Sequence, residues 1–198
     1  MVLLESKAPA DPLTLFRRWY REVQDAGAPQ PDAVALATAG AEGPSVRMVL
    51  FKGIQDGSFL FYSNYDSRKG RDLAENNRAA FVFYWPATRH QVRVSGTVRR
   101  LDRKASLAYF RSRPRGAQLS ALASRQSRAV PSRKVLERAV AKLAENYPGD
   151  VPLPPDWGGY ALRPRWIEFW ENREDRLHDR LRYMRKTGGG WRLERLAP

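Results

Sequence analysis

RMVLFKGIQDGSFLFYSNYDSRK, residues 47–69, is the stretch of this sequence that most clearly predicts the fold. Its first part alternates apolar and polar side chains, as a half-buried strand does, and carries cations at Arg47 and Lys52. The cluster Gln55–Ser58 contains Asp-Gly, which supplies the left-handed backbone that a tight hairpin needs. We therefore predict that this turn leads the first strand into a second, apolar strand at Phe59–Tyr62.

Hydroxyl, amide and cationic side chains follow the second strand, where a helix can begin. They are Ser63, Asn64, Ser67, Arg68 and Lys69. Unpaired N–H groups at a helix start, short hydroxyl donors and two cations together suit a phosphate group. The alternative is a solvated hairpin with a charged rim, and both interpretations fit this stretch taken alone.

The chain before this stretch predicts one packing helix and one strand. Residues 1–10 have no periodic pattern and are expected to form a flexible tail. Asp11 and Pro12 form an N-cap and first helical residue, and apolar side chains then recur at helical spacing up to Gly27. The small-residue run Ala33–Ala39 predicts a strand.

The chain after this stretch predicts a helix and then more strands. Arg68–Asn76 is helical in pattern, and the apolar run Ala79–Trp85 predicts a strand buried on both faces. His90–Leu101 alternates, with Gly96 as a β-bulge. Consecutive strands joined by short turns indicate an antiparallel sheet or barrel and argue against a Rossmann arrangement.

Residues 102–147 predict a helical insertion within one domain that spans residues 1–198. Asp102 caps its first helix, which ends at Arg113-Pro114. Two more helices, Ala117–Ser124 and Ser132–Asn146, are expected to complete the insertion. After the extended proline-rich segment Val151–Trp157, the predicted strands are Gly159–Leu162, Trp166–Trp170, Arg176–Arg185 and Trp191–Leu196.

The composition excludes several classes of site. The chain has 198 residues, no cysteine and only two histidines, so we expect no disulfide, no thiolate nucleophile and no metal site. No apolar run approaches the ~20 residues that span a bilayer, and we expect a cytoplasmic protein without a membrane partner. The net charge of +14 is spread along the chain without a basic tail, which favours specific anion sites over nucleic-acid binding.

A second polar run, Arg176–Arg180, has the sequence RLHDR. On a strand, Arg176, His178 and Arg180 point to one face. Two guanidinium groups beside an imidazole suit an anion or a planar ligand, whereas the alternative is a strand that faces solvent. A Ser-His-Asp triad is not supported, because His178 and its neighbour Asp179 point to opposite faces of a strand.

A third candidate lies at the end of the first insertion helix. Tyr109 and Arg113 are four residues apart and share one helical face, so a phenol and a guanidinium can reach the same phosphate. The alternative is a helix end that carries arginine to suit its dipole. There is no GxGxxG motif and no P-loop.

Taken together, these motifs resemble the pyridoxamine (pyridoxine) 5'-phosphate oxidase family over Asp11–Pro198. The motifs are DPLTLFRRW, RMVLFKG, FYSNYDSRKG, HQVRVSG, YFRSRPRGAQ, ASRQS, VPLPPDWGGY, IEFW, RLHDR and RLAP. The resemblance implies a mainly β, α+β fold: an FMN-binding split β-barrel with an N-terminal helix and a helical insertion. It also implies a homodimer with FMN in clefts at the interface.

The resemblance further implies roles for individual residues. The implied FMN contacts are Arg47, Met48, Val49, Leu50, Lys52, Tyr62, Ser63, Arg68, Lys69, Gln91, Gln126, Ser127, Trp170 and Arg180. The implied substrate contacts are Lys52, Tyr109, Arg113, Arg176 and His178. Of these, Arg176 and His178 are the implied catalytic pair, which contacts the pyridine ring and its phenolic oxygen.

The implied reaction oxidises pyridoxamine or pyridoxine 5'-phosphate to pyridoxal 5'-phosphate, with O2 as the acceptor and H2O2 as a product. Two alternatives stay open: an oxidase of the same superfamily with another substrate, as in the phenazine pathway, and a flavin- or pyridoxal-phosphate-binding protein without turnover. Nucleic-acid binding alone is a more distant possibility.

Some positions depart from the family pattern. Ala117 replaces a serine that helps hold the substrate phosphate, a loss worth about 1.5 to 3 kcal/mol. Ser120 and Leu122 replace a glycine and a tryptophan, and Asn172-Arg173 replaces a small turn. The basic arm that precedes the first helix in many members is not recognisable in residues 1–10. We expect weaker substrate binding or a different substrate from these changes.

Overall fold

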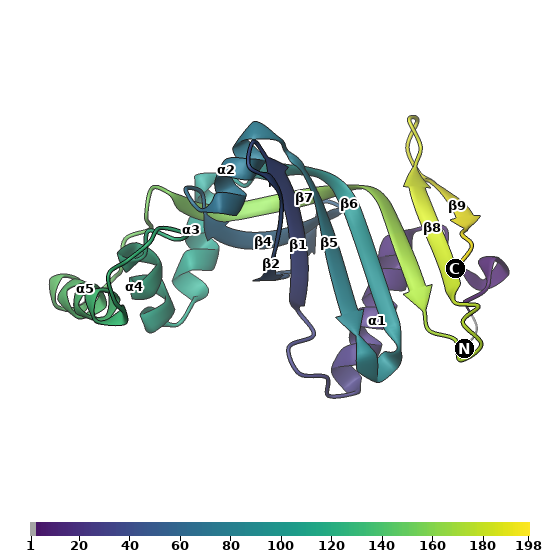
Figure 1. Cartoon of the computed structure of the whole chain (residues 1–198), viewed down its shortest axis with the longest axis horizontal. Helices are drawn as coiled ribbons and strands as arrows, with labels where there is room; N and C mark the ends of the chain where they lie inside the picture. The colour runs from purple at the N-terminus through teal and green to yellow at the C-terminus, as the bar shows by residue number, and fades with distance from the viewer. Residues whose placement is uncertain (1–2) are drawn as a thin grey trace.

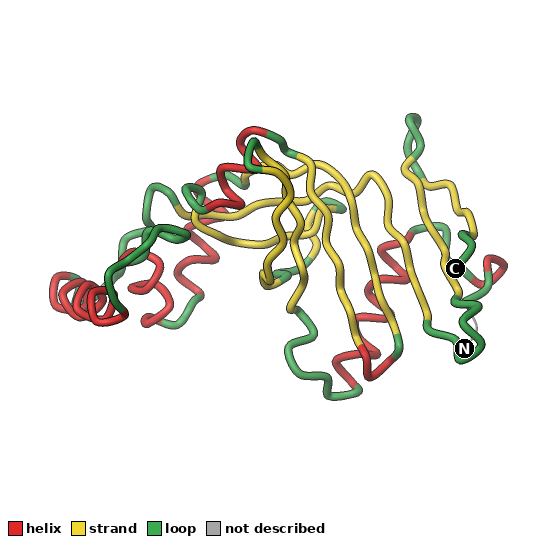
Figure 2. The backbone as a smooth tube through the Cα atoms, viewed as in Figure 1, coloured by secondary structure: helices red, strands yellow, loops and turns green. Residues whose placement is uncertain are grey.

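The computed structural model describes residues 3–198 (Figures 1 and 2). The helices are η1 Glu5–Lys7, α1 Pro12–Asp25, α2 Arg68–Glu75, η2 Pro86–Thr88, α3 Arg103–Ser112, α4 Arg115–Ala123 and α5 Arg133–Asn146. The strands are β1 Ala33–Gly40, β2 Gly43–Leu50, β3 Ile54–Gln55, β4 Ser58–Asn64, β5 Arg78–Trp85, β6 His90–Arg100, β7 Trp157–Glu171, β8 Asp179–Arg185 and β9 Trp191–Arg195. None of the helices in this range is long and apolar enough to cross a membrane.

The described strands form one antiparallel sheet in the order β2-β1-β5-β6-β7-β4-β3, with β8 and β9 branching from β7. The branch arises because β7 is long: Leu162 pairs with β4, whereas Trp166 pairs with β8. The sequence predicted two strands here, Gly159–Leu162 and Trp166–Trp170, but they form one continuous strand. The predicted β-bulge at Gly96 is confirmed by a register shift between β6 and β7. A Cβ atom at this position would collide with the carbonyl of Arg163.

The core lies between α1 and the concave face of the sheet. The predicted helix is confirmed, and Asp11 caps it by accepting a hydrogen bond from Leu13 N at 3.1 Å. The ring of Phe16 lies edge-on to Phe59 and Phe83, at centroid distances of 4.9 and 5.1 Å. Burying such aromatic side chains stabilises the fold by roughly 2 to 3 kcal/mol each.

The predicted hairpin is correct in its turn and wrong in its partner. Asp56 and Gly57 have the expected positive φ values of 49° and 70°, but their turn joins β4 only to the two-residue β3. β2 pairs instead with β1 along its whole length. Gly53, with a φ of 101°, interrupts the chain between β2 and β3. Two short strands therefore replace the continuous one that the alternation predicted.

The prediction that β5 is buried on both faces is also wrong. Phe81 and Phe83 are fully buried, whereas Tyr84 between Phe83 and Trp85 is 61% exposed. On β2, Val46, Met48 and Leu50 are exposed in the same alternating way. The sheet thus has one packed face and one open apolar face.

The N-terminal segment differs from the expected loose tail. Leu3 is buried, its carbonyl accepts a hydrogen bond from Arg195, and Glu5 forms an ion pair with Arg195 at 2.6 Å. These partners lie about 190 residues away in sequence, so no local pattern could indicate them. The first two residues of the predicted tail lie outside the described residues.

The helical insertion is confirmed as α3, α4 and α5. Asp102 caps α3 through Ala105 N at 2.6 Å, as predicted. Phe110, Leu119, Val151 and Trp157 form a small core separate from the main one, and Leu143 of α5 packs against it. In Figure 1, this insertion and the β8–β9 hairpin lie at opposite ends of the molecule.

Candidate functional site

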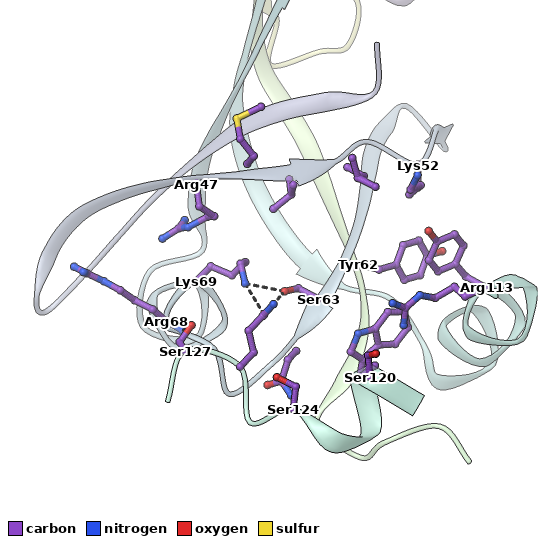
Figure 3. A pocket seen from close by; sticks show the side chains of 18 of the residues that line it. Arg47, Lys52, Tyr62, Ser63, Arg68, Lys69, Arg113, Ser120, Ser124 and Ser127 are labelled. Carbon is purple, nitrogen blue, oxygen red and sulfur yellow. Dashed lines mark hydrogen bonds between the residues drawn. The ribbon is translucent and has the colours of Figure 1, made fainter. Parts of the chain in front are cut away.

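A cleft of about 720 Å³ opens between the β2 edge, β4, the start of α2 and the insertion helices (Figure 3). Its lining includes most of the residues that the sequence analysis assigned to FMN, together with Tyr109 and Arg113. The predicted residues in the lining are Arg47, Met48, Val49, Leu50, Lys52, Tyr62, Ser63, Arg68, Lys69, Tyr109, Arg113, Gln126 and Ser127. Segments far apart in sequence therefore meet at one site.

Lys69 forms the polar centre of the cleft. Its Nζ lies 2.9 Å from Ser63 Oγ, 3.0 Å from Ser67 Oγ and 2.8 Å from Gln126 Oε1. The residue is only 7% exposed, and no carboxylate of residues 3–198 lies within ion-pair distance of it. Burial, and then the nearby Arg47, lower the pKa of Lys69 to about 8. A buried ammonium group with only neutral partners is suited to an anionic ligand.

Arg47 adds a second cation to this end of the cleft. Its guanidinium donates hydrogen bonds of 2.6 Å to Thr38 Oγ1 and to Ser45 Oγ, and it lies 3.6 Å from the buried carboxylate of Asp72. Burial lowers the pKa of Arg47. Thr38 in turn donates to Asp72 at 2.6 Å. Asp72 and Thr38 therefore hold Arg47 in place, although neither was predicted.

The start of α2 lies beside these two cations. Ser67 caps the helix by accepting a hydrogen bond from Gly70 N, and Arg68 N donates to Ser127 Oγ at 3.3 Å. The loop that carries Ser127 has a positive φ of 71° at that residue. At the helix start, these two N–H groups are thus bonded to hydroxyl groups beside the cations Lys69 and Arg47. That a phosphate binds here stays a prediction.

The other end of the cleft is aromatic and cationic. Tyr62 and Tyr109 stack with ring centroids 3.7 Å apart, and the guanidinium of Arg113 lies 4.8 Å from the ring centroid of Trp157. Arg113 Nη1 is buried without a hydrogen-bond partner among the described residues. Burial lowers the pKa of Arg113. A buried guanidinium nitrogen without a partner is suited to an anionic ligand.

Lys52 is in the cleft but is engaged by another residue. Its Nζ lies 2.8 Å from Asp32 Oδ2, and both side chains are partly exposed. Figure 3 shows Lys52 near Tyr62 and Arg113, at the end opposite Arg47 and Arg68. A ligand at this end must therefore share Lys52 with Asp32.

Several lining residues were missed by the sequence analysis. They are Ser45, Val46, Ser120, Ala121, Ser124 and Trp157. Asn64, which the sequence analysis named in the polar run after the second strand, also lines the cleft. Val46 shares the alternation of Met48 on β2, which could have indicated it. Ser124 and Trp157 lie in motifs that the sequence analysis quoted, and Ser120 was named as a departure from the family pattern, but nothing local connects them to the cleft.

Gln91, Trp170, Arg176, His178 and Arg180 do not line this cleft. Gln91, Trp170 and Arg180 are cross-strand neighbours on β6, β7 and β8, and the His178 ring lies 4.7 Å from Trp170. We call these five residues the β8 cluster. They gather near the β8–β9 end of the molecule, away from the insertion helices (Figure 1).

The prediction that Arg176 and His178 lie on a strand is wrong. β8 begins at Asp179, and residues 172–178 form a turn in which Arg176 has a φ of 67°. Asp175 accepts a hydrogen bond from Leu177 N at 3.0 Å, which closes this turn. Arg176 and His178 therefore do not share a pleated face with Arg180.

Glu168 fixes Arg180 within the β8 cluster. Its side chain is 3% exposed, and one carboxylate oxygen accepts from Arg180 Nε at 3.0 Å. The other oxygen accepts from Arg93 Nη1 at 3.2 Å. A buried carboxylate shared by two guanidinium groups holds both in defined positions.

The open face of the sheet links the two sites. Met48 is 64% exposed on β2, and Tyr84 is 61% exposed beside Gln91, its cross-strand neighbour. Exposed apolar side chains on one face of a sheet are typical of protein interfaces.

Comparison with known proteins identifies the family. The family described as "Pyridoxamine 5'-phosphate oxidase" matches residues 21–147, and a "Pyridoxine 5'-phosphate oxidase C-terminal dimerisation region" matches residues 157–198. A pyridoxine/pyridoxamine 5'-phosphate oxidase of Salinibacter ruber is 52% identical over 193 residues, covering 95% of this chain and 89% of the relative. Another such oxidase, from Rubrobacter xylanophilus, is 51% identical, and the match covers 99% of this chain and 91% of the relative.

Two solved structures share the fold. PhzG from Burkholderia lata, in complex with tetrahydrophenazine-1-carboxylic acid, has a TM-score of 0.93 and 34% identity and covers 100% of this chain and 98% of its own. An FMN-binding protein of Nostoc punctiforme has a TM-score of 0.76 and 20% identity, covering 98% and 99%. The predicted mainly β fold, with its N-terminal helix and helical insertion, is thus confirmed. The chain belongs to the pyridoxamine 5'-phosphate oxidase family.

Proposed function

We propose that this protein is an FMN-dependent oxidase that converts pyridoxamine 5'-phosphate and pyridoxine 5'-phosphate to pyridoxal 5'-phosphate. The observation that carries the proposal is a single cleft with two anion-binding ends. Within residues 3–198, Lys69 at one end is a buried cation without a carboxylate in ion-pair distance, and Arg113 at the other end has an unsatisfied guanidinium donor. Two phosphorylated, planar molecules side by side fit this arrangement.

The FMN phosphate is assigned to the Lys69 end. Lys69, Arg47 and Arg68 supply charge there, and Ser63, Gln126 and Ser127 supply polar contacts. Met48, Val49 and Leu50 on β2 and Tyr62 on β4 flank the flavin. Bound FMN supplies the two-electron redox chemistry, and the protein supplies orientation and charge.

The substrate phosphate is assigned to Arg113, Tyr109 and Lys52. This places the oxidisable carbon of the substrate between the aromatic wall and the flavin site. The substrate loses two electrons and two protons, one hydrogen from the carbon and one proton from its hydroxyl or amino group, and O2 takes them up to give H2O2. For the amine substrate, water then replaces nitrogen, which leaves as ammonia.

The β8 cluster requires a partner chain in this proposal. Gln91, Trp170, Arg176, His178 and Arg180 lie outside the cleft of their own chain, so they can reach a flavin only in another copy. The open apolar face with Met48 and Tyr84, together with the match of residues 157–198 to a dimerisation region, supports a homodimer. Each cleft is then completed by the partner's β8 cluster.

The direct test is a spectrum followed by an oxidase assay. The purified protein should show flavin absorbance, and adding pyridoxine 5'-phosphate in air should yield aldehyde and H2O2 in equal amounts. Lys69→Met should lose flavin, whereas Lys104→Met, at an exposed position on α3, should not. A yellow protein that oxidises neither vitamin B6 phosphate would contradict the proposed substrate.

A second candidate function is oxidation of a phenazine precursor. It is supported by the TM-score of 0.93 to PhzG and by Ala117, Ser120 and Leu122, where the vitamin B6 oxidase pattern is not kept. Tetrahydrophenazine-1-carboxylic acid carries no phosphate, so Arg113→Met should spare its oxidation and abolish that of pyridoxine 5'-phosphate. Assaying the two substrates with the wild type and with Arg113→Met separates the two candidate functions.

A further inference from the structure

The turn of residues 172–178 fixes the protonation pattern of His178. Arg173 N donates a hydrogen bond to His178 Nδ1 at 3.0 Å. A backbone N–H can only donate, so Nδ1 must be the acceptor and carries no proton. In the neutral imidazole, the ring proton therefore lies on Nε2.

The side chain of Arg173 also stabilises this turn, through Asp179. Its Nε donates to Asp179 Oδ2 at 2.7 Å, and its Nη2 lies 2.6 Å from the same oxygen. Asp179 is buried at the start of β8 and also accepts from Arg195 Nη1 at 2.7 Å. The residue that donates to His178 is thus tied to the residue that follows His178. The Trp170 ring packs beside the imidazole, with the two ring centroids 4.7 Å apart.

We propose that His178 acts as a neutral hydrogen-bond donor through Nε2–H, and that Arg173 is the positioning residue that sets this tautomer. Nδ1 is occupied by the backbone and Nε2 carries the proton, so the ring has no free lone pair with which to act as a general base. An Nε2–H suits an electronegative ligand atom such as the ring oxygen of a pyridinol. This last assignment rests on the proposed function; the tautomer and its cause do not.

The tautomer can be measured directly by NMR. The chain has only two histidines, so ¹⁵N-histidine labelling of the flavin-loaded protein gives two ring systems, and a His178→Gln sample assigns them. Correlations between ring nitrogens and carbon-bound protons distinguish Nε2–H, Nδ1–H and the cation. We expect Nε2–H for His178 near pH 7. An Nδ1–H tautomer or an imidazolium there would overturn the proposal.

The role of Arg173 is tested in the same spectra. Arg173→Gln removes the ion pair to Asp179 but keeps the backbone N–H, so His178 should become a mixture of tautomers, and Arg173→Lys should restore most of the Nε2–H form. Arg89→Gln is the matched control, because Arg89 pairs with Glu174 of the same turn and both side chains are exposed. An unchanged tautomer of His178 in Arg173→Gln would show that Arg173 does not position the ring.

Two isosteric variants test what the tautomer does. Glutamine places its N–H near the position of Nε2, and asparagine places it near Nδ1. His178→Gln should therefore retain roughly ten-fold more kcat/KM than His178→Asn, with flavin content equal in both. Equal losses would contradict a donor role. If the wild type oxidises no vitamin B6 phosphate, the proposed function fails, while the NMR result on the tautomer stands independently.

Discussion

The cleft around Lys69 and the β8 cluster differ in how they are built. The cleft is assembled within one chain, from β2, β4, α2 and the insertion, and its central cation is buried among hydroxyl and amide groups. The β8 cluster lies at the other end of the sheet. Glu168 holds its Arg180 in an ion pair, and Asp179, next to His178, pairs with Arg195. One region is a cleft that gathers cations and hydroxyl groups, whereas the residues of the other do not line that cleft. This difference supports the proposal that the chain carries two halves of a site.

The largest expected effect follows from the buried cation. Lys69→Met should weaken FMN binding roughly a hundred-fold, because it removes the central charge-assisted hydrogen bonds to the phosphate. This loss is measured by titrating the flavin-free protein with FMN and monitoring the quenching of flavin fluorescence. Lys104→Met serves as the exposed-lysine control. An equal affinity in Lys69→Met would move the phosphate away from this end of the cleft.

A smaller effect is expected from the β8 cluster. Glu168→Gln should free Arg180 and Arg93 and weaken FMN binding roughly ten-fold, although Glu168 does not line the cleft of its own chain. The matched control is Glu194→Gln, which breaks a pair with Arg182 at 2.6 Å on the neighbouring strand.

Two further results sharpen the Glu168 prediction. In an Arg180→Met background, Glu168→Gln should add little, since the carboxylate acts through that guanidinium. Full additivity of the two changes would show that Glu168 acts on the flavin site by another route.

The pH dependence of FMN binding should report Lys69. Its folded pKa is about 8, so below pH 8 the free protein already carries the ammonium and the affinity should be flat. Above pH 8 binding must take up a proton, and the affinity should fall by up to about ten-fold per pH unit. Isothermal titration in buffers of different ionisation enthalpy measures the uptake, which Lys69→Met should abolish.

The smallest effect concerns how the β8 cluster is anchored. Hydrogen bonding to Arg195 lowers the pKa of Glu5 from 4.5 to about 2. The pair therefore contributes stability above about pH 4.5, and this contribution is lost as the pH falls toward 2. Because the pair is solvent-exposed, Glu5→Gln should cost at most about 1 kcal/mol at neutral pH. Urea unfolding should show that the difference in free energy of unfolding between wild type and Glu5→Gln shrinks between pH 4.5 and 2. A difference that stays constant would assign the effect to packing.

Local patterns predicted the elements well and their partners poorly. Asp11, Asp102 and Asp56-Gly57 act over a few residues, so the caps and the turn were predictable. β2 pairs with β1 because Gly53 interrupts the chain before the hairpin turn. β7 is continuous because it pairs with β6 along most of its length.

The same limit applies to the site. The Lys69 end was visible in FYSNYDSRK because its hydroxyl groups and cations are neighbours in sequence. Asp72 with Thr38, and Asp32 with Lys52, were missed because these partners are 34 and 20 residues apart. Gln126 and Ser127 were assigned only through the family resemblance. The turn at Arg176 and His178 was mistaken for strand, because alternating charges resemble a solvent-facing strand.

The central claim is that each cleft is completed by the partner's β8 cluster. A mixed dimer of one Lys69→Met chain and one Arg180→Met chain, purified through two different tags, tests it most directly. One cleft of this dimer keeps both Lys69 and the partner's Arg180, so we predict tight FMN binding at half the wild-type stoichiometry. Each parent homodimer should bind FMN weakly at both sites. A mixed dimer that binds no FMN tightly would show that Arg180 serves its own chain and would contradict the account.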